Sequence, residues 1–211
     1  MHSVEHLIPV LEQAKLSPFS GFTYRVIADR WRSSPLSAIG ALQRGGRYNP
    51  PGEFAVLYTA DSQFTALREV EALFLDAEGE LRGVPRNPDL ILTLECSLLS
   101  TLDLTDAGLL ERLGTSDKEL VADSPSRFIE NARGRTTPTQ NLGSACFRSG
   151  HISAIKVPSA ANQAGFCIDI LIECLFEGEF VRVRDDSGAL RVELVGQIPR
   201  RALAIRLNSG L

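Results

Sequence analysis

The sequence predicts an α+β domain with a β-rich core, and two observations point to this class. Helical and strand-like patterns are mixed along the chain without a strict βαβ alternation, and the last third is read almost wholly as short strands. The glycine-rich phosphate loops G-x-G-x-x-G and G-x-x-x-x-G-K-[ST] are both absent from the sequence. Together these observations favour an α+β fold over a doubly wound parallel sheet.

The helices are predicted from apolar spacing and capping residues. Val4, Leu7 and Leu11 keep the spacing of one helix face. Ser62, or Asp61 before it, can accept the free N–H groups of the first turn of a second helix. The predicted helices cover residues 4–16, 36–42, 62–76, 107–113 and 117–122, and a further one begins at Thr137-Pro138, because proline is favoured at the first helical position.

The strands are predicted from short apolar and β-branched runs bounded by turn residues. They cover residues 22–27, 54–59, 90–96, 99–104, 152–157, 167–173, 179–184, 190–195 and 202–207. The stretch 32–53 is rich in Gly, Pro, Ser and Arg and is read as a long loop around the short helix at 36–42. Loops of this length in compact domains are usually functional or disordered.

Composition excludes several classes of protein. The 211 residues carry 22 basic and 26 acidic side chains, a net charge of −4, which argues against a general nucleic-acid binder. The four cysteines form no C-x-x-C pair and are expected to be reduced thiols of the core rather than metal ligands. The N-terminus lacks a signal-peptide pattern, and no apolar run reaches the roughly 20 residues of a membrane helix. A cytoplasmic protein without a membrane segment is therefore expected.

The most unusual stretch is Gln-Arg-Gly-Gly-Arg-Tyr-Asn-Pro-Pro-Gly at residues 43–52. Paired glycines allow a ligand to approach the backbone closely, and Arg47 directly after them can offer paired hydrogen bonds to a phosphate. The alternative is a surface loop with a solvated arginine, and composition alone favours that alternative.

Three further positions carry possible chemistry. Tyr58 follows Arg47 by eleven residues, and Glu69 follows Tyr58 by eleven, on the edge of an apolar helix stripe where a carboxylate can face a cleft. Ser159 comes directly after a strand that stops at Pro158. Each has a plain alternative: a core tyrosine, a solvated helix glutamate and a turn serine.

Taken together, the motifs resemble the RES domain, a family named for an arginine, a glutamate and a serine. In chain order they are Tyr24-Arg25, Gly-Gly-Arg-Tyr-Asn at 45–49, Leu-Tyr-Thr at 57–59, Ala-Leu-Arg-Glu at 66–69 and Val-Pro-Ser at 157–159. The matching positions are Arg47, Glu69 and Ser159. The resemblance covers roughly residues 22 to 180, and residues 45–69 are its most specific part.

The resemblance implies an ADP-ribosyltransferase-like fold, a mixed-sheet core split around an NAD⁺ cleft with flanking helices. It implies that NAD⁺ is a substrate cleaved at the nicotinamide–ribose bond, with inorganic phosphate or water as acceptor and no metal. Arg47, Glu69 and Ser159 would be the catalytic set, with Glu69 stabilising an oxocarbenium-like state. Arg47 would hold the pyrophosphate, Tyr58 and Tyr48 would line the nicotinamide pocket, and Ser159 would orient the substrate.

The resemblance also implies a toxin held in a hetero-oligomer with an Xre-type helix-turn-helix antitoxin that occludes the active site, without direct contact to nucleic acid. A protein ADP-ribosyltransferase and a catalytically silent antitoxin-binding module are the alternatives, and the choice between NAD⁺ and NADP⁺ stays open. The expected organisation is a helical extension over 1–20 and a RES domain over 21–211 with a helical insertion near 105–150.

Overall fold

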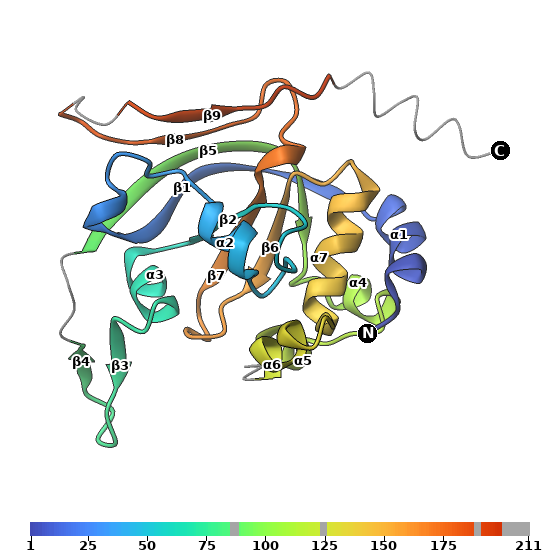
Figure 1. The fold of residues 1–211 in the computed structure, drawn as a ribbon, viewed down its shortest axis with the longest axis horizontal. Helices are drawn as coiled ribbons and strands as arrows, with labels where there is room; N and C mark the ends of the chain where they lie inside the picture. The colour runs from blue at the N-terminus through green and yellow to red at the C-terminus, as the bar shows by residue number, and fades with distance from the viewer. Residues whose placement is uncertain (85–88, 123–125, 188–190, 200–211) are drawn as a thin grey trace.

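The computed structural model describes residues 1–84, 89–122, 126–187 and 191–199, and its centre is a small mixed β-barrel (Figure 1). The barrel strands are β1 Leu16–Ala28, β2 Val56–Ala60, β5 Asp89–Asp103, β6 Ala154–Pro158 and β7 Phe166–Leu171. They follow the order β1-β2-β7-β6-β5, and β1 closes the ring by pairing with β5. Only the β5–β6 pair within this ring is parallel.

Two further strand pairs lie outside the ring. Strands β8 Phe180–Val183 and β9 Glu193–Val195 extend the sheet from the middle of β5. Strands β3 Leu73–Leu75 and β4 Leu81–Gly83 form a separate hairpin that stands away from the body of the molecule (Figure 1).

The helices cover the barrel on the side of β2, β6 and β7 (Figure 1). They are α1 Val4–Glu12, α2 Ile39–Arg44, α3 Gln63–Glu69, α4 Ala107–Arg112, α5 Asp117–Val121, α6 Ser126–Ala132 and α7 Pro138–Ser149, with 3₁₀ turns at Asp29–Trp31 and Ile172–Cys174. Within the described residues, no helix has the length and apolar character needed to span a bilayer.

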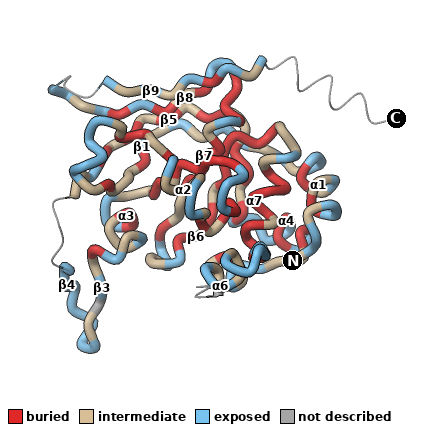
Figure 2. The backbone as a smooth tube through the Cα atoms, viewed as in Figure 1, coloured by how far each residue is buried: buried red, intermediate tan, exposed pale blue. Residues whose placement is uncertain are grey.

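Two apolar clusters stabilise this arrangement, one on each face of the strands. Buried residues concentrate in the barrel strands and in α7 (Figure 2). The first cluster fills the inside of the barrel, and every barrel strand contributes at least one side chain to it. One from each strand, in chain order, is Ile27, Leu57, Leu94, Ala154 and Ile168. Side chains alternate between the two faces of a strand, so the strands also present apolar side chains on the outside of the barrel. These pack against the helices and form the second cluster, which we call the helix cluster.

The helix cluster includes side chains from both ends of the sequence. Leu7 and Leu11 of α1 pack with Leu142 and Cys146 of α7 and with Ile155 of β6, and all five are buried. The N-terminal helix therefore contributes to the core. Strand β1 continues without a break across the expected boundary at residue 20, and the division into 1–20 and 21–211 stays a prediction.

The α+β class with a mixed sheet is confirmed, and most elements lie where the sequence predicts them. Helix α7 begins at Pro138 with a capping box between Thr137 and Gln140, as expected. The predicted strands at 90–96 and 99–104 are one 15-residue strand, β5. The predicted strand at 202–207 lies outside the described residues.

Three predictions of helix extent are wrong. Helix α1 ends at Glu12 instead of 16, because Leu16 already pairs with Leu102 in the β1–β5 ladder. The helix predicted at 36–42 is shifted to Ile39–Arg44. In addition to these errors of extent, the short helix α6 was not predicted from the sequence.

The third is the helix predicted at 62–76. Ser62 does cap it, by accepting from the Thr65 N–H at 3.1 Å, but α3 ends at Glu69. Glu71 then adopts a left-handed backbone with φ of 57°, which stops a right-handed helix. The residues beyond it enter the β3–β4 hairpin, so the predicted helix does not continue to residue 76.

Candidate active site

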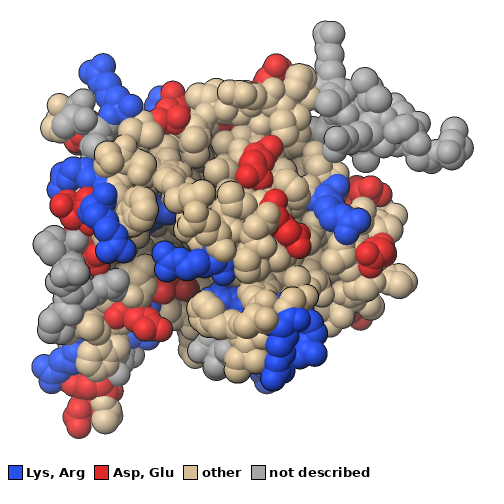
Figure 3. All heavy atoms as spheres, in the orientation of Figure 1, with Lys and Arg blue, Asp and Glu red and all other residues tan. Residues whose placement is uncertain are grey.

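A cleft of about 660 Å³ opens between the outer face of β2, β6 and β7 and the segments that cover it. Its walls come from β1, α2, the loop that follows α2, α3 and α6. In the space-filling view, basic and acidic side chains meet around a hollow on the face that carries α2 and α3 (Figure 3). Its charged lining residues are Arg25, Arg44, Arg47, Arg127, Glu69, Glu71 and Asp169.

Residues 45–49, Gly-Gly-Arg-Tyr-Asn, form a segment that we call the glycine-arginine loop. It lies so close to β2 and α7 that two of the contacts require glycine. A Cβ placed on Gly46 would lie 2.2 Å from the hydroxyl oxygen of Tyr58. A Cβ placed on Gly143 of α7 would lie 1.6 Å from the carbonyl oxygen of Tyr48. Neither position accommodates a side chain in this packing. The backbone that carries Arg47 is therefore held in place by β2 on one side and by α7 on the other.

Two buried amide side chains fix the same loop by hydrogen bonds. Asn49 donates through Nδ2 to the carbonyls of Ala41 and Phe54, at 2.8 and 3.1 Å. Gln140 at the start of α7 donates through Nε2 to the carbonyls of Gly46 and Asn49, at 3.1 and 3.2 Å. Buried amides with satisfied donors hold a single backbone conformation, which preorganises the loop.

Arg47 lines the cleft, and among the described residues only its Nη1 is engaged in hydrogen bonds. Its Nη1 donates to the carbonyl oxygens of Leu120 and Ala122, at 3.2 and 2.7 Å, at the C-terminal end of α5. Within the described residues, Nε and Nη2 make no hydrogen bond. The guanidinium is therefore oriented by neutral acceptors and keeps two donor groups for an anionic ligand.

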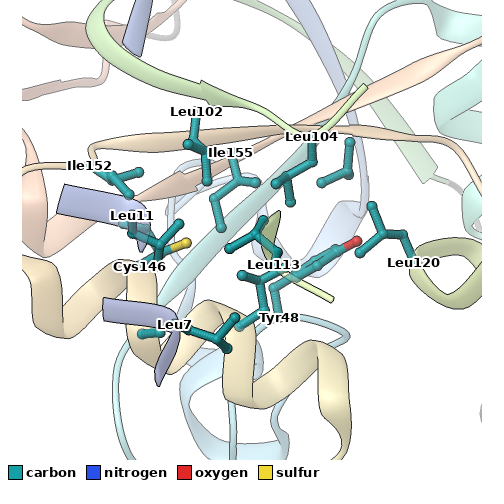
Figure 4. Packing of buried hydrophobic residues seen from close by; sticks show 14 of the residues in the cluster. Leu7, Leu11, Tyr48, Leu102, Leu104, Leu113, Leu120, Cys146, Ile152 and Ile155 are labelled. Carbon is teal, nitrogen blue, oxygen red and sulfur yellow. The ribbon is translucent and has the colours of Figure 1, made fainter. Parts of the chain in front are cut away.

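The two tyrosines of the sequence motifs have different surroundings. Tyr58 lines the cleft from β2; its hydroxyl donates to Asn49 Oδ1 at 2.8 Å and accepts from the Tyr48 N–H at 3.1 Å. Tyr48 contributes to the cleft lining, but its side chain is 1% exposed and packs beside Leu113 and Leu120 in the helix cluster (Figure 4). Its ring is thus covered by core residues, and its part in ligand binding stays a prediction.

Glu69 and Ser159 are in direct contact. The Ser159 hydroxyl donates to Glu69 Oε1 at 2.5 Å, and the Ala161 N–H donates to the same oxygen at 3.3 Å. Ser159 is buried and also accepts from the Asn162 N–H at 3.0 Å, so the turn after β6 fixes the hydroxyl. Glu69 is exposed and lines the cleft, and in the described part of the chain its Oε2 accepts no hydrogen bond. One carboxylate oxygen is anchored and the other is available to a ligand.

Two cleft residues were missed by the assignment of roles from the sequence. Arg25 of β1 donates through Nη2 to the Ser37 carbonyl at 2.9 Å, and its buried Nη1 has no hydrogen-bond partner in the described part of the chain. Burial lowers the pKa of Arg25 to about 10. Asp169 of β7 is 2% exposed, and no described residue forms a hydrogen bond with its Oδ1. For Asp169 the available signal was a charged residue inside the otherwise apolar strand Phe166–Leu171, because charged side chains are rarely buried without a partner or a function.

Metal chemistry has no support in the described residues, which contain no group of three or more His, Cys, Asp or Glu side chains placed to bind an ion. The four cysteines are free, as expected, and Cys96, Cys146 and Cys174 are buried. Cys167 differs because it lines the cleft, and its thiol lies 3.7 Å from Glu69 Oε1. Burial, together with Asp169 and Glu69, raises the pKa of this thiol, which disfavours a thiolate nucleophile.

The arrangement combines arginine donors, an aromatic wall and an anchored carboxylate in one cleft. The arginines can bind phosphates, and the carboxylate can stabilise a positive charge that develops on a bound ligand. The structure therefore brings Arg47, Tyr58 and Glu69 to one cleft and places Ser159 directly behind Glu69.

Comparison with known proteins identifies similar chains. The RES domain family matches residues 23–190. Curated relatives described as NAD(+) phosphorylase MbcT, from Mycobacterium bovis and Mycobacterium tuberculosis, are 35% identical over 92 residues. That match covers 42% of this chain and 47% of the relatives, so the chain spans about half the length of the curated relatives it matches.

The fold resembles a solved structure along nearly its whole length. The crystal structure of the Mycobacterium tuberculosis MbcT–MbcA toxin–antitoxin complex contains a chain that superposes with a TM-score of 0.62. The match covers 97% of this chain and 96% of the other, at 22% sequence identity. At this identity the likeness establishes a shared fold.

Proposed function

The chain belongs to the RES domain family, and on that premise we propose that it is the toxin of a toxin–antitoxin pair and degrades NAD⁺ by phosphorolysis. The observation that carries the proposal is the contact between Ser159 and Glu69, in the cleft that Glu69 and Arg47 both line. The description of the curated relatives as NAD(+) phosphorylases favours phosphate as the acceptor.

The proposed reaction breaks the bond between C1 of the ribose and the nicotinamide nitrogen. The bonding electron pair leaves with nicotinamide, whose ring becomes neutral, and the ribose develops oxocarbenium character. The Glu69 carboxylate stabilises that positive charge through its available oxygen, as a carboxylate does in glycoside cleavage. A phosphate oxygen then bonds to C1, which yields ADP-ribose 1-phosphate.

The other cleft residues bind and orient the dinucleotide. Arg47 binds the pyrophosphate with its unengaged donors, and the unpartnered Nη1 of Arg25 supplies a second cationic contact. Tyr58 forms an aromatic wall for the nicotinamide. Ser159 is a positioning residue, because it acts on the substrate through Glu69.

We expect the purified protein, free of any partner, to consume NAD⁺ when inorganic phosphate is present. Nicotinamide and ADP-ribose 1-phosphate should accumulate in equal amounts, measured by chromatography. Equal loss without phosphate would identify a glycohydrolase. Nicotinamide release with the ADP-ribose label retained on protein, and without free ADP-ribose or its 1-phosphate, would identify an ADP-ribosyltransferase. No reaction at all would leave only a binding module.

We also propose that an Xre-type helix-turn-helix antitoxin occludes this cleft. The support is the shared fold with a chain of a toxin–antitoxin complex and two exposed apolar side chains of α6. Phe128 lines the cleft and is 64% exposed, and its neighbour Ile129 is 52% exposed. Exposed neighbouring apolar side chains of this kind commonly mark a protein contact.

Saturating amounts of the cognate partner are expected to suppress NAD⁺ turnover by at least about tenfold. Phe128→Ser should weaken the complex, measured by titration calorimetry. A stable complex that turns over NAD⁺ at the rate of the free protein would rule out occlusion.

A further inference from the structure

Asp169 is a buried carboxyl group that the proposed reaction does not use. It lies on β7 directly opposite Tyr58 of β2 and Ile155 of β6 in the two strand ladders, so the three side chains share one face of the sheet. The side chain is 2% exposed and lines the cleft, and its Oδ1 has no hydrogen-bond partner among the residues that the structure describes. A buried polar atom without a partner costs free energy of folding, so its retention calls for an explanation.

The surroundings of Asp169 favour the uncharged acid. Burial and the neighbouring charge of Glu69 raise its pKa well above the ordinary value, and Arg47 opposes the shift only in part. Tyr48, Tyr58 and Cys167 are the other titratable groups around it, and burial raises the pKa of each of them as well. The proton therefore stays on Asp169 at pH values at which an exposed aspartate has lost it.

An uncharged carboxyl group both donates and accepts a hydrogen bond. A primary carboxamide has the complementary pair, a carbonyl that accepts and an NH₂ group that donates. Phosphate is a poorer match for this position, because an uncharged acid beside the Glu69 carboxylate offers no positive charge, whereas the arginines of the cleft do.

We propose that Asp169 recognises the carboxamide of the nicotinamide ring and so determines the specificity of the cleft for the group at the 3-position. The inference rests on the proposed NAD⁺ cleavage. The ring itself would lie against Tyr58, whose backbone position is directly across the ladder from Asp169. Recognition by a buried polar group is selective, because a ligand that lacks the matching donor leaves that group unpaired.

The test compares NAD⁺ with its 3-acetylpyridine analogue, in which a methyl group replaces the NH₂ group. Asp169→Leu, close in size and apolar, is expected to lower kcat/KM for NAD⁺ by about 10- to 100-fold. It should lower kcat/KM for the analogue much less, so that the preference for NAD⁺ is lost. Asp169→Asn keeps a donor and an acceptor and should retain the preference within a few-fold. Equal losses for both substrates would show a purely structural role and overturn the inference.

Binding of free nicotinamide separates this inference from the proposed function. Calorimetric titration of the wild type and Asp169→Leu with nicotinamide and with 3-acetylpyridine needs no turnover. If the wild type prefers nicotinamide and Asp169→Leu does not, the inference holds even where NAD⁺ is not cleaved. If NAD⁺ is cleaved but Asp169→Leu retains the wild-type preference, the inference fails while the proposed function stands.

Thermal unfolding checks that the variant folds and that Asp169 is uncharged. Because the folded-state pKa is raised, the stability that the uncharged acid contributes is lost as the pH rises from the unfolded-state value of about 3.9 to the raised folded-state pKa. Asp169→Leu has no such group, and its melting temperature should exceed that of the wild type by more at pH 7 than at pH 4. An unchanged or reversed difference would show that Asp169 is ionised and would contradict the proposed pairing.

Discussion

Replacing Glu69 by glutamine is expected to lower kcat for NAD⁺ cleavage by about 100- to 1000-fold. Glutamine has nearly the same shape, so the change removes the negative charge while the side-chain oxygen can still accept from Ser159 and from the Ala161 N–H. Because the charge matters most when the ribose becomes positive, the loss should fall on kcat more than on KM. Steady-state kinetics with nicotinamide release as the signal measures both constants.

The fold should survive this substitution. Glu69 is exposed at the end of α3 and makes no ion pair in the described residues, so the melting temperature should stay within about 2 °C. Glu12→Gln, at the exposed end of α1, is the matched control and should leave kcat unchanged. Ser159→Ala removes the anchor but keeps the charge, so its loss in kcat should be smaller, about tenfold. A fully active Glu69→Gln would exclude this carboxylate from the mechanism.

The residues that the sequence motifs bring together also meet in space, for reasons of chain geometry. Tyr58 lies on β2, Glu69 on the helix that follows it, and the glycine-arginine loop directly precedes β2. Three consecutive segments joined by short connections pack as neighbours, so the site within residues 45–69 could be predicted locally. Ser159 joins it because β7 pairs with both β2 and β6, which brings the end of β6 beside the helix that follows β2.

The residues missed by the sequence depend on contacts between distant segments. Asp169 is opposite Tyr58 only once β7 pairs with β2, a register that no local pattern specifies. The position of Tyr48 follows from the close approach of α7 at Gly143, a contact across about half of the chain. The end of α3 follows from the left-handed backbone of Glu71, an unusual conformation for a residue that is not glycine.

Replacing Arg47 by alanine is expected to lower kcat/KM for NAD⁺ by about 10- to 100-fold, mainly through a higher KM. The guanidinium holds its place by donating Nη1 to Leu120 and Ala122, which leaves Nε and Nη2 for the pyrophosphate. Arg47→Lys keeps the charge but loses the planar pair of donors, so it should have an intermediate KM. Arg148→Ala, an exposed arginine on α7, is the control and should match the wild type.

The same experiment tests which arginine binds the phosphates. Arg25 lies in the same cleft with an unpartnered Nη1, so it is the other candidate for that contact. If Arg47→Ala leaves both KM and kcat unchanged while Arg25→Ala raises KM, the pyrophosphate is bound at β1, and the glycine-arginine loop has a structural role. If both variants raise KM and the double variant raises it further, the two arginines share the dinucleotide, since independent contacts contribute additively.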